Sequence, residues 1–380
     1  MNYIQLGDVI ATAKVNRCGE NDFPVLSITK SDGIVLQSEK FKKRIASKDT
    51  ADYKVVHRGQ LVQGIHIDEA NFGIQEVVDI GIVSPAYKIW NIKSNIIVPK
   101  YLEIVLRSPR SIAYYASKFN GSIKRRERLS DKDFLQMRIP CPAVEEQIYA
   151  IEVLNKAAEL IGQRRQQLIE LDNLIKARFV EMFGGYSEAT KLSEVASVTG
   201  GLTKNTKRDK LPLRMPYLRV ANVAFASIDV SEMLDIGLTE EECEKTLLQP
   251  EDLLFVEGNG SPDQIGRVAI WKNEIVPCVH QNHLIKSRFN KSKVLPVFAM
   301  YYFMSQQGRE QIKSKAVSTS GLYTLSVSKV ATLLLPTPPM ELQEQFAAFV
   351  EQVDKSKVVV QKALDEAQTL FDSLMQEYFG

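Results

Sequence analysis

Two long stretches of the chain repeat apolar residues in alternating steps of three and four, one after Pro142 and one after Pro338. This seven-residue period predicts two coiled-coil helices of about 39 residues, each about 58 Å long. Neither apolar stripe can remain in water, so we predict that the helices pack on each other; separate packing against other partners is the alternative. The seam positions are Ile151, Leu154, Ala158, Ile161, Arg165, Leu168, Asp172, Ile175, Phe179 and Met182 in the first helix, and Phe346, Val350, Val353, Lys357, Val360, Leu364, Ala367, Phe371, Leu374 and Tyr378 in the second.

The segments before each long helix carry mixed signals. Residues 53–56, 77–87, 252–256, 267–271 and 284–289 are rich in β-branched and aromatic residues typical of strands, whereas residues 99–119 and 294–315 are helical in pattern. The expected fold is therefore α/β: two similar mixed α/β domains joined by two long antiparallel coiled-coil helices. We place the domains at residues 1–143 and 186–339, and the helices at 144–185 and 340–380.

The two halves of the chain repeat each other. Four blocks recur in the same order, which makes chance similarity a poor explanation. The matched blocks are Leu6–Val9 with Leu192–Val195, Leu129-Ser130 and Arg138–Pro142 with Leu325-Ser326 and Leu334–Pro338, Glu146-Gln147 with Glu344-Gln345, and Glu181–Gly184 with Glu377–Gly380.

Composition narrows the class of protein. The chain has 380 residues, with Lys+Arg 48 against Asp+Glu 46 and a net charge of +2. This length suggests two or three domains, and a hydrophobic content of 44% is ordinary for a globular chain. The sequence contains neither an apolar run long enough for a transmembrane helix nor a secretory signal, and its four cysteines are scattered. We predict a cytoplasmic protein.

A search for catalytic motifs yields little. The sequence has no phosphate-binding loop of the Gly-x-x-x-x-Gly-Lys-Ser/Thr type, and the glycines of residues 258–266 have the wrong spacing for a dinucleotide loop. His280 and His283 lack partners at metal-ligand spacing, so we interpret them as hydrogen-bonding residues. We predict that the chain has no catalytic residues, no metal and no cofactor of its own.

Basic clusters point instead to DNA. One lies in residues 118–128 and another in residues 204–219, one in each half, on segments rich in Gly, Ser or Asn. Lys and Arg there would neutralise phosphates, and neighbouring polar side chains would read bases. The candidate DNA-binding residues are Lys124, Arg125, Arg126, Arg128, Lys204, Lys207, Arg208, Arg219, Asn222, Asn259, Arg267, Gln281, Asn282 and His283. His66, Asn71 and Gln75 are weaker candidates in the first half.

This arrangement resembles the specificity subunit of type I restriction-modification enzymes. The resemblance lies in two variable domains, each followed by Pro-x-Pro, Glu-Gln and a long helix, and it covers the whole chain. Residues 171–184 resemble the central conserved region of that family. Residues 81–87, 121–129, 257–267 and 280–284 resemble segments of its target recognition domains.

The resemblance implies a non-catalytic subunit whose two target recognition domains each read half of a bipartite site in double-stranded DNA. The helices would set the spacing and dock two modification subunits, which bind S-adenosylmethionine and methylate adenine at N6. Two restriction subunits would add translocation and cleavage with ATP and Mg. A type IIB-like specificity subunit and a stand-alone DNA-binding scaffold remain alternatives. We also predict which residues dock the partner subunits. Four are apolar residues that do not belong to the coiled-coil seam, and two lie at the helix ends. They are Ile148, Ile169, Leu171, Leu174, Phe183 and Phe379.

Overall fold

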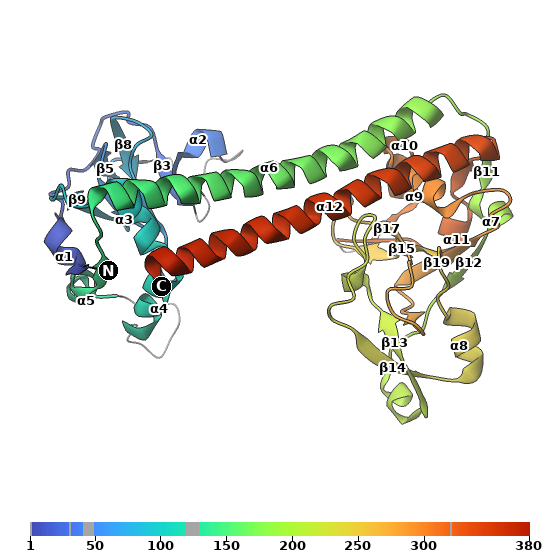
Figure 1. The fold of residues 1–380 in the computed structure, drawn as a ribbon. Helices are drawn as coiled ribbons and strands as arrows, with labels where there is room; N and C mark the ends of the chain where they lie inside the picture. The colour runs from blue at the N-terminus through green and yellow to red at the C-terminus, as the bar shows by residue number, and fades with distance from the viewer. Residues whose placement is uncertain (1, 30–31, 41–48, 119–128, 320) are drawn as a thin grey trace. The chain divides into compact units, whose positions relative to one another are not determined.

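The computed structural model describes residues 2–29, 32–40, 49–118, 129–319 and 321–380, and it divides the chain into two units (Figure 1). Unit 1 contains Met1–Arg165 and Gln361–Gly380, and unit 2 contains Gln166–Val360. The two long helices are α6 (Val144–Phe183) and α12 (Met340–Phe379). Each of them is divided between the units: the first part of α6 and the last part of α12 belong to unit 1, and the remainder of both belongs to unit 2. Within the described ranges, every helix is too short or too polar to cross a membrane.

The long helices pack in antiparallel fashion within each unit. In unit 1, Ala150 near the start of α6 is buried in the same core as Phe379 at the end of α12. In unit 2, the rings of Phe183 and Phe346 lie 5.5 Å apart. Two of the polar seam positions satisfy each other, because Lys357 Nζ lies 2.5 Å from Asp172 Oδ1. The predicted antiparallel coiled-coil helices are therefore present.

Unit 1 is built around an antiparallel sheet with the strand order β2-β9-β6-β7. Its core includes stacked Phe72 and Phe134, with ring centroids 5.5 Å apart, and buried Trp90. The elements of unit 1 before α6 are β1 (Tyr3–Gln5), α1 (Leu6–Val9), β2 (Ile10–Thr12), β3 (Leu26–Thr29), β4 (Gly33–Leu36), α2 (Gln37–Lys40), β5 (Lys54–His57), β6 (Leu61–Gln63), η1 (Ile67–Glu69), β7 (Phe72–Ile74), β8 (Ile80–Val83), β9 (Lys88–Ile92), α3 (Pro99–Leu106), α4 (Pro109–Lys118), α5 (Asp131–Gln136) and β10 (Arg138–Pro140).

Unit 2 repeats this plan with the sheet β12-β19-β15-β17 and adds the small sheets β14-β13-β18 and β16-β21-β20. Its elements between the long helices are β11 (Ala189–Lys191), α7 (Leu192–Val195), β12 (Ala196–Gly200), η3 (Thr206–Lys210), β13 (Leu213–Leu218), η4 (Val220–Asn222), β14 (Leu234–Leu238), α8 (Glu240–Thr246), β15 (Leu253–Val256), β16 (Gly258–Asn259), β17 (Val268–Ile270), β18 (Val279–His280), β19 (Leu284–Phe289), α9 (Pro296–Met304), α10 (Gln306–Lys315), β20 (Val317–Thr319), β21 (Leu322–Thr324), α11 (Val327–Ala331) and β22 (Leu334–Pro336).

A buried glutamine marks the start of each long helix and corrects one detail of the predicted repeat. Gln147 accepts a hydrogen bond from the Val98 amide and donates to the carbonyls of Ile96 and Pro142. Gln343 makes the same three bonds with Leu295, Lys293 and Pro338. Gln147 therefore corresponds to Gln343 and not to Gln345, which is exposed.

Each predicted helix before the Pro-x-Pro is in fact two helices. In unit 1 the break between α3 and α4 falls at Arg107-Ser108, because Pro109 disfavours helical backbone at the residue before it. In unit 2, Ser305 separates α9 from α10 and caps the second helix, its hydroxyl accepting from the Gly308 amide at 3.3 Å. A Cβ at Gly308 would lie 2.2 Å from the Tyr302 carbonyl oxygen, so this tight reversal requires glycine.

Candidate nucleic-acid interface

A short turn in unit 2, residues 281–283 between β18 and β19, links three of the predicted segments. The Gln281 amide donates to the Leu218 carbonyl at 3.0 Å, beside Arg219. The Asn282 amide donates to the Leu202 carbonyl at 3.0 Å, where the basic segment begins. Gln281 and Asn282 are half-buried. The backbone contacts therefore bring the ends of loops that are distant in sequence onto one surface.

The side chain of His283 extends this surface to a fourth segment. His283 is exposed, and its Nδ1 lies 2.7 Å from Oε2 of Glu257. Glu257 begins the loop that carries Asn259 and Arg267, and the Asn259 side-chain oxygen accepts from the Ser261 amide. We call residues 202–210, 219–222, 257–267 and 281–283 together the polar rim of unit 2.

Three residues that we predicted to read bases form hydrogen bonds within this rim. Asn222 is buried, and its amide group bonds the Arg219 amide and the carbonyls of Asp229 and Glu232. Arg219 donates to the Glu232 carbonyl at 3.1 Å. Arg267 is half-buried, and its Nη2 lies 3.4 Å from the Val220 carbonyl oxygen. The structure thus shows Asn222 holding the loop that presents Arg219; base contact by these residues stays a prediction.

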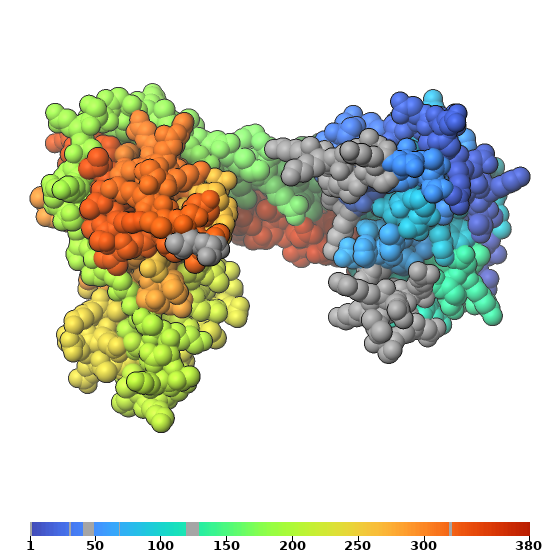
Figure 2. Space-filling view, turned by 180° about the vertical axis from the view of Figure 1, so that it is seen from behind, coloured from blue at the N-terminus to red at the C-terminus, as the bar shows by residue number. Residues whose placement is uncertain are grey.

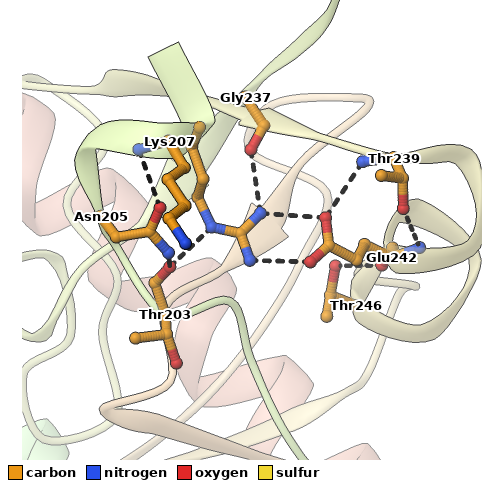
Figure 3. A network of polar contacts seen from close by, with 8 residues as sticks. Thr203, Asn205, Lys207, Gly237, Thr239, Glu242 and Thr246 are labelled. Atoms are coloured by element: carbon orange, nitrogen blue, oxygen red, sulfur yellow. Dashed lines mark hydrogen bonds and ion pairs between the residues drawn. The ribbon is translucent and has the colours of Figure 1, made fainter. Parts of the chain in front are cut away.

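Arg208 is the most firmly held cation of the basic segment, and its partners Thr203, Gly237 and Glu242 are labelled in Figure 3. Its guanidinium forms a bidentate pair with Glu242 at 2.8 and 2.9 Å and also donates to the carbonyls of Thr203 and Gly237. Glu242 occupies the N3 position of α8 and belongs to its capping box with Thr239. The Arg208 side chain lowers the pKa of the Glu242 carboxyl. This network ties the basic segment to α8.

The neighbouring lysines are placed differently from Arg208. Lys204, Lys207 and Lys210 are exposed, and among the described residues none of their ammonium groups has an ion-pair partner. The backbone amide of Lys207 donates to the side-chain oxygen of Asn205 at 3.0 Å, as Figure 3 shows. These lysines therefore carry exposed positive charge, whereas Arg208 already has its counter-ion.

Unit 2 also contains a set of largely buried polar groups that the sequence did not reveal. Asp252, which is 1% exposed, pairs with Arg288 at 2.7 and 2.8 Å. Lys286 donates to the carbonyls of Lys245 and Leu247 at the end of α8, and burial lowers its pKa to about 8. Burial also lowers the pKa of His280 to about 4, while its Nδ1 lies 3.0 Å from the Leu284 carbonyl oxygen. His280 therefore faces inward and His283 outward.

The first-half candidates mostly lie outside this description. Lys124, Arg125, Arg126 and Arg128 fall outside the described residues. Of the weaker candidates, Gln75 is buried, with its amide bonded to the backbone of residues 77–78, whereas His66 is exposed and Asn71 half-buried.

The two basic clusters, one in each half of the chain, stand at different places in the order of the repeated elements. Residues 119–128 lie between α4 and α5, and the matching position in unit 2, between α10 and α11, carries the β20–β21 hairpin. Residues 204–219 instead follow β12, the counterpart of β2. The stretches that follow corresponding elements therefore differ in charge between the two halves of the sequence.

The predicted docking residues divide into exposed and buried sets. Ile148, Ile169 and Leu174 are 44%, 53% and 49% exposed. Leu171 is half-buried against the unit 2 core. Phe183 and Phe379 lie inside the cores of their units, where they contact Phe298 and Tyr101 respectively, and so offer little surface.

Other exposed apolar residues on the long helices were not singled out from the sequence. Val180, Val358 and Val359 are 63–70% exposed in unit 2. These valines could have been recognised from the sequence, because they lie next to residues of the coiled-coil seam without belonging to it. Val180, for example, follows Phe179.

Comparisons with known proteins agree on one family. The family model for the type I restriction modification DNA specificity domain matches residues 187–367. The type I restriction enzyme EcoKI specificity subunit of Escherichia coli K12 is 23% identical over 265 residues, covering 63% of this chain and 55% of that protein. The putative MjaX specificity subunit of Methanocaldococcus jannaschii is 25% identical over 197 residues, covering 50% and 45%. The chain thus spans about half the length of these curated relatives.

Solved structures show the same fold along the whole chain. A chain from a study of complex assembly and conformational transition of the type I R-M system superposes with a TM-score of 0.62 at 15% identity, covering 100% of this chain and 97% of that one. The S subunit of a type I restriction-modification system from M. genitalium gives a TM-score of 0.52 at 12% identity, covering 100% and 96%.

Proposed function

We propose that this chain, which belongs to the family of type I restriction-modification specificity subunits, reads a bipartite site in double-stranded DNA with one half-site for each unit. The observation that carries the proposal is the structural repeat. Both units have the same sheet order, and in both a buried glutamine ties the start of a long helix to the same place in the fold. Two similar modules in one chain suit two separate stretches of DNA.

The unit 2 half of the proposal rests on the polar rim. Its exposed lysines, Lys204 and Lys207, would supply positive charge for phosphates, and the turn at residues 281–283, which contacts the backbone at Leu202, would supply donors and acceptors. Contacts to the DNA phosphates set the position of a protein on the duplex, whereas amide and imidazole groups distinguish one base from another. We assign phosphate contact to the lysines, and base contact to the turn and to Arg219, Asn259 and Arg267.

DNA selection tests the proposal. The purified full chain is incubated with random duplex DNA, and bound molecules are sequenced over several rounds. We expect two short fixed blocks separated by an unspecified spacer of constant length, since both long helices continue from one unit into the other. A single contiguous block, or no enrichment, would contradict the proposal.

We further propose that methyl transfer and cleavage are performed by partner modification and restriction subunits. The modification subunits would dock on the exposed apolar residues of the long helices, Ile148, Ile169 and Leu174. Burial of one such side chain contributes about 1.5–3 kcal/mol. Leu174→Ser should therefore weaken co-purification with a modification subunit about tenfold or more, whereas Asn173→Ser, an exposed polar neighbour, should not. Equal retention of both variants would remove this face from the docking surface.

A further inference from the structure

A pocket of about 620 Å³ lies in unit 1, where both long helices join the rest of the unit. The first turns of α6, the last turn of α12 and the start of α3 line it, and Figure 1 shows the start of α6 close to the end of α12, which is marked C. Cavities of about 300–1,000 Å³ are typical of ligand sites. The side chains that determine its chemistry are Tyr101, Glu146, Tyr149, Ala150, Glu377 and Tyr378.

The structural repeat explains why this place is open in unit 1. Because Gln147 corresponds to Gln343, Ala150 corresponds to Phe346, three residues further along each helix. Phe346 is fully buried, and its ring lies 5.4 Å from the ring of Phe179 on the other long helix. Figure 2 shows the green end of α6 beside the orange part of the chain that includes α9 and α10 on the surface of unit 2. The aromatic ring that fills this place in unit 2 is therefore replaced by a methyl group in unit 1.

Tyr101 adds a polar group that has no partner. It corresponds to Phe298, since each lies two residues after the proline that begins α3 or α9. Tyr101 is 1% exposed, and among the described residues its buried hydroxyl has no hydrogen-bond partner. Burial raises the pKa of this hydroxyl, and the neighbouring Cys141, Tyr3 and Glu146 raise it further, so the group stays protonated. An unpaired buried hydroxyl is unfavourable, and a ligand that supplied its partner would be stabilised.

The rest of the pocket is acidic and aromatic. Glu146 and Glu377 are exposed, and neither carboxylate forms an ion pair within the described part of the chain. Tyr149 is 62% exposed and Tyr378 is half-buried. Burial raises the pKa of Tyr378, and Tyr149 and Glu377 raise it further, which shows that these three groups lie close together. The described lining contains no Lys or Arg, so its negative charge has no counter-ion in the fold.

We propose that this pocket binds the guanidinium group of an arginine side chain that a protein partner presents. A guanidinium is planar, so it can stack on tyrosine rings while its N–H groups pair with carboxylates and donate to a hydroxyl oxygen. The same carboxylates repel phosphate, so the pocket does not suit DNA. Ile148 lies on the same turn of α6, and a modification subunit docked there would be the source of the arginine; this source alone rests on the proposed function.

Binding of a short arginine peptide to the purified full chain tests the pocket. The tyrosine rings are labelled with ¹³C, and the signals of Tyr101, Tyr149 and Tyr378 are identified by their loss in Tyr→Phe variants. The peptide acetyl-Gly-Arg-Gly-amide should shift all three signals in a saturable titration. The same peptide with citrulline, an uncharged isostere, in place of arginine should shift none of them.

Two double substitutions separate the pocket carboxylates from general negative charge. Glu146→Gln with Glu377→Gln should weaken binding of the arginine peptide about tenfold or more, because charge-assisted hydrogen bonds to the guanidinium are lost. Glu145→Gln with Glu152→Gln removes the same charge from exposed residues of α6 outside the pocket lining and should leave binding unchanged. All four side chains are exposed, so both variants should fold. Ala150→Phe, which introduces the ring found in unit 2, should abolish binding.

Three results would overturn the proposal: equal binding of the arginine and citrulline peptides, equal losses in the two double variants, or tighter binding of spermidine than of the arginine peptide. Peptide binding by a chain that does not retain a modification subunit would support the pocket and refute the proposed docking. Co-purification of that subunit with a chain that does not bind the peptide would refute the pocket and support the docking.

Discussion

Replacement of Gln343 by alanine tests how each long helix is fixed to its unit. The side chain is fully buried, accepts from the Leu295 amide at 2.9 Å, and donates to the carbonyls of Lys293 and Pro338 at 3.2 and 2.9 Å. Gln343→Ala leaves these three backbone groups without a partner. An unsatisfied buried group costs about 1–3 kcal/mol, so we expect the free energy of unfolding to fall by about 3–5 kcal/mol.

Tryptophan fluorescence can follow this loss in unit 2 alone. The chain has two tryptophans, and each is buried in a different unit, Trp90 in unit 1 and Trp271 in unit 2. In a Trp90→Phe background, urea unfolding monitored at Trp271 reports unit 2. Gln343→Ala should shift this transition to lower urea with little change in its slope.

Gln345→Ala provides the matched control, because Gln345 is exposed two residues away on the same helix. It should change the free energy of unfolding by less than about 0.5 kcal/mol. Equal effects of the two substitutions, or a larger effect at Gln345, would refute both the anchoring role of Gln343 and its correspondence with Gln147.

Three further predictions follow from the site. Arg208→Lys keeps the charge but loses the bidentate pair, so urea unfolding of unit 2 should show a loss of about 1–2 kcal/mol. Lys204→Ala with Lys207→Ala should lower the salt slope of DNA binding by about 0.9 per lost contact, whereas Lys355→Ala, on an exposed part of α12, should leave it unchanged. His280 has a pKa of about 4 in the folded protein against an ordinary 6.5, so below pH 6.5 the unfolded state binds a proton that the folded state does not. The free energy of unfolding should therefore fall by about 2 kcal/mol between pH 7 and pH 5. The substitution His280→Asn should remove most of that pH dependence.

The sequence predicted the features that depend on local periodicity. The seven-residue repeat located both long helices, and the repeated blocks revealed two similar halves. The predicted correspondence of Gln147 with Gln345 was wrong because it was based on the identical Glu-Gln dipeptides alone. The distance from the preceding proline was the better guide, since Gln147 follows Pro142 by the same interval as Gln343 follows Pro338.

The site was less predictable because the partners of its charges are distant in sequence. Nothing near Arg208 indicates that Glu242 will neutralise it, nor does the neighbourhood of Asp252 reveal its pairing with Arg288. Residue type alone therefore could not distinguish the Arg and Lys side chains that form ion pairs within the fold from those that are exposed and could bind an anion.

The central claim is that this chain specifies a bipartite DNA site for a modifying complex. The most direct measurement is single-molecule sequencing of DNA from the source organism for N6-methyladenine, with and without the gene for this chain. The account predicts a methylated motif of two fixed blocks around an unspecified spacer, present with the gene and lost on its deletion. Bipartite methylation that persists after deletion, or a gene-dependent motif with a single uninterrupted block, would contradict it.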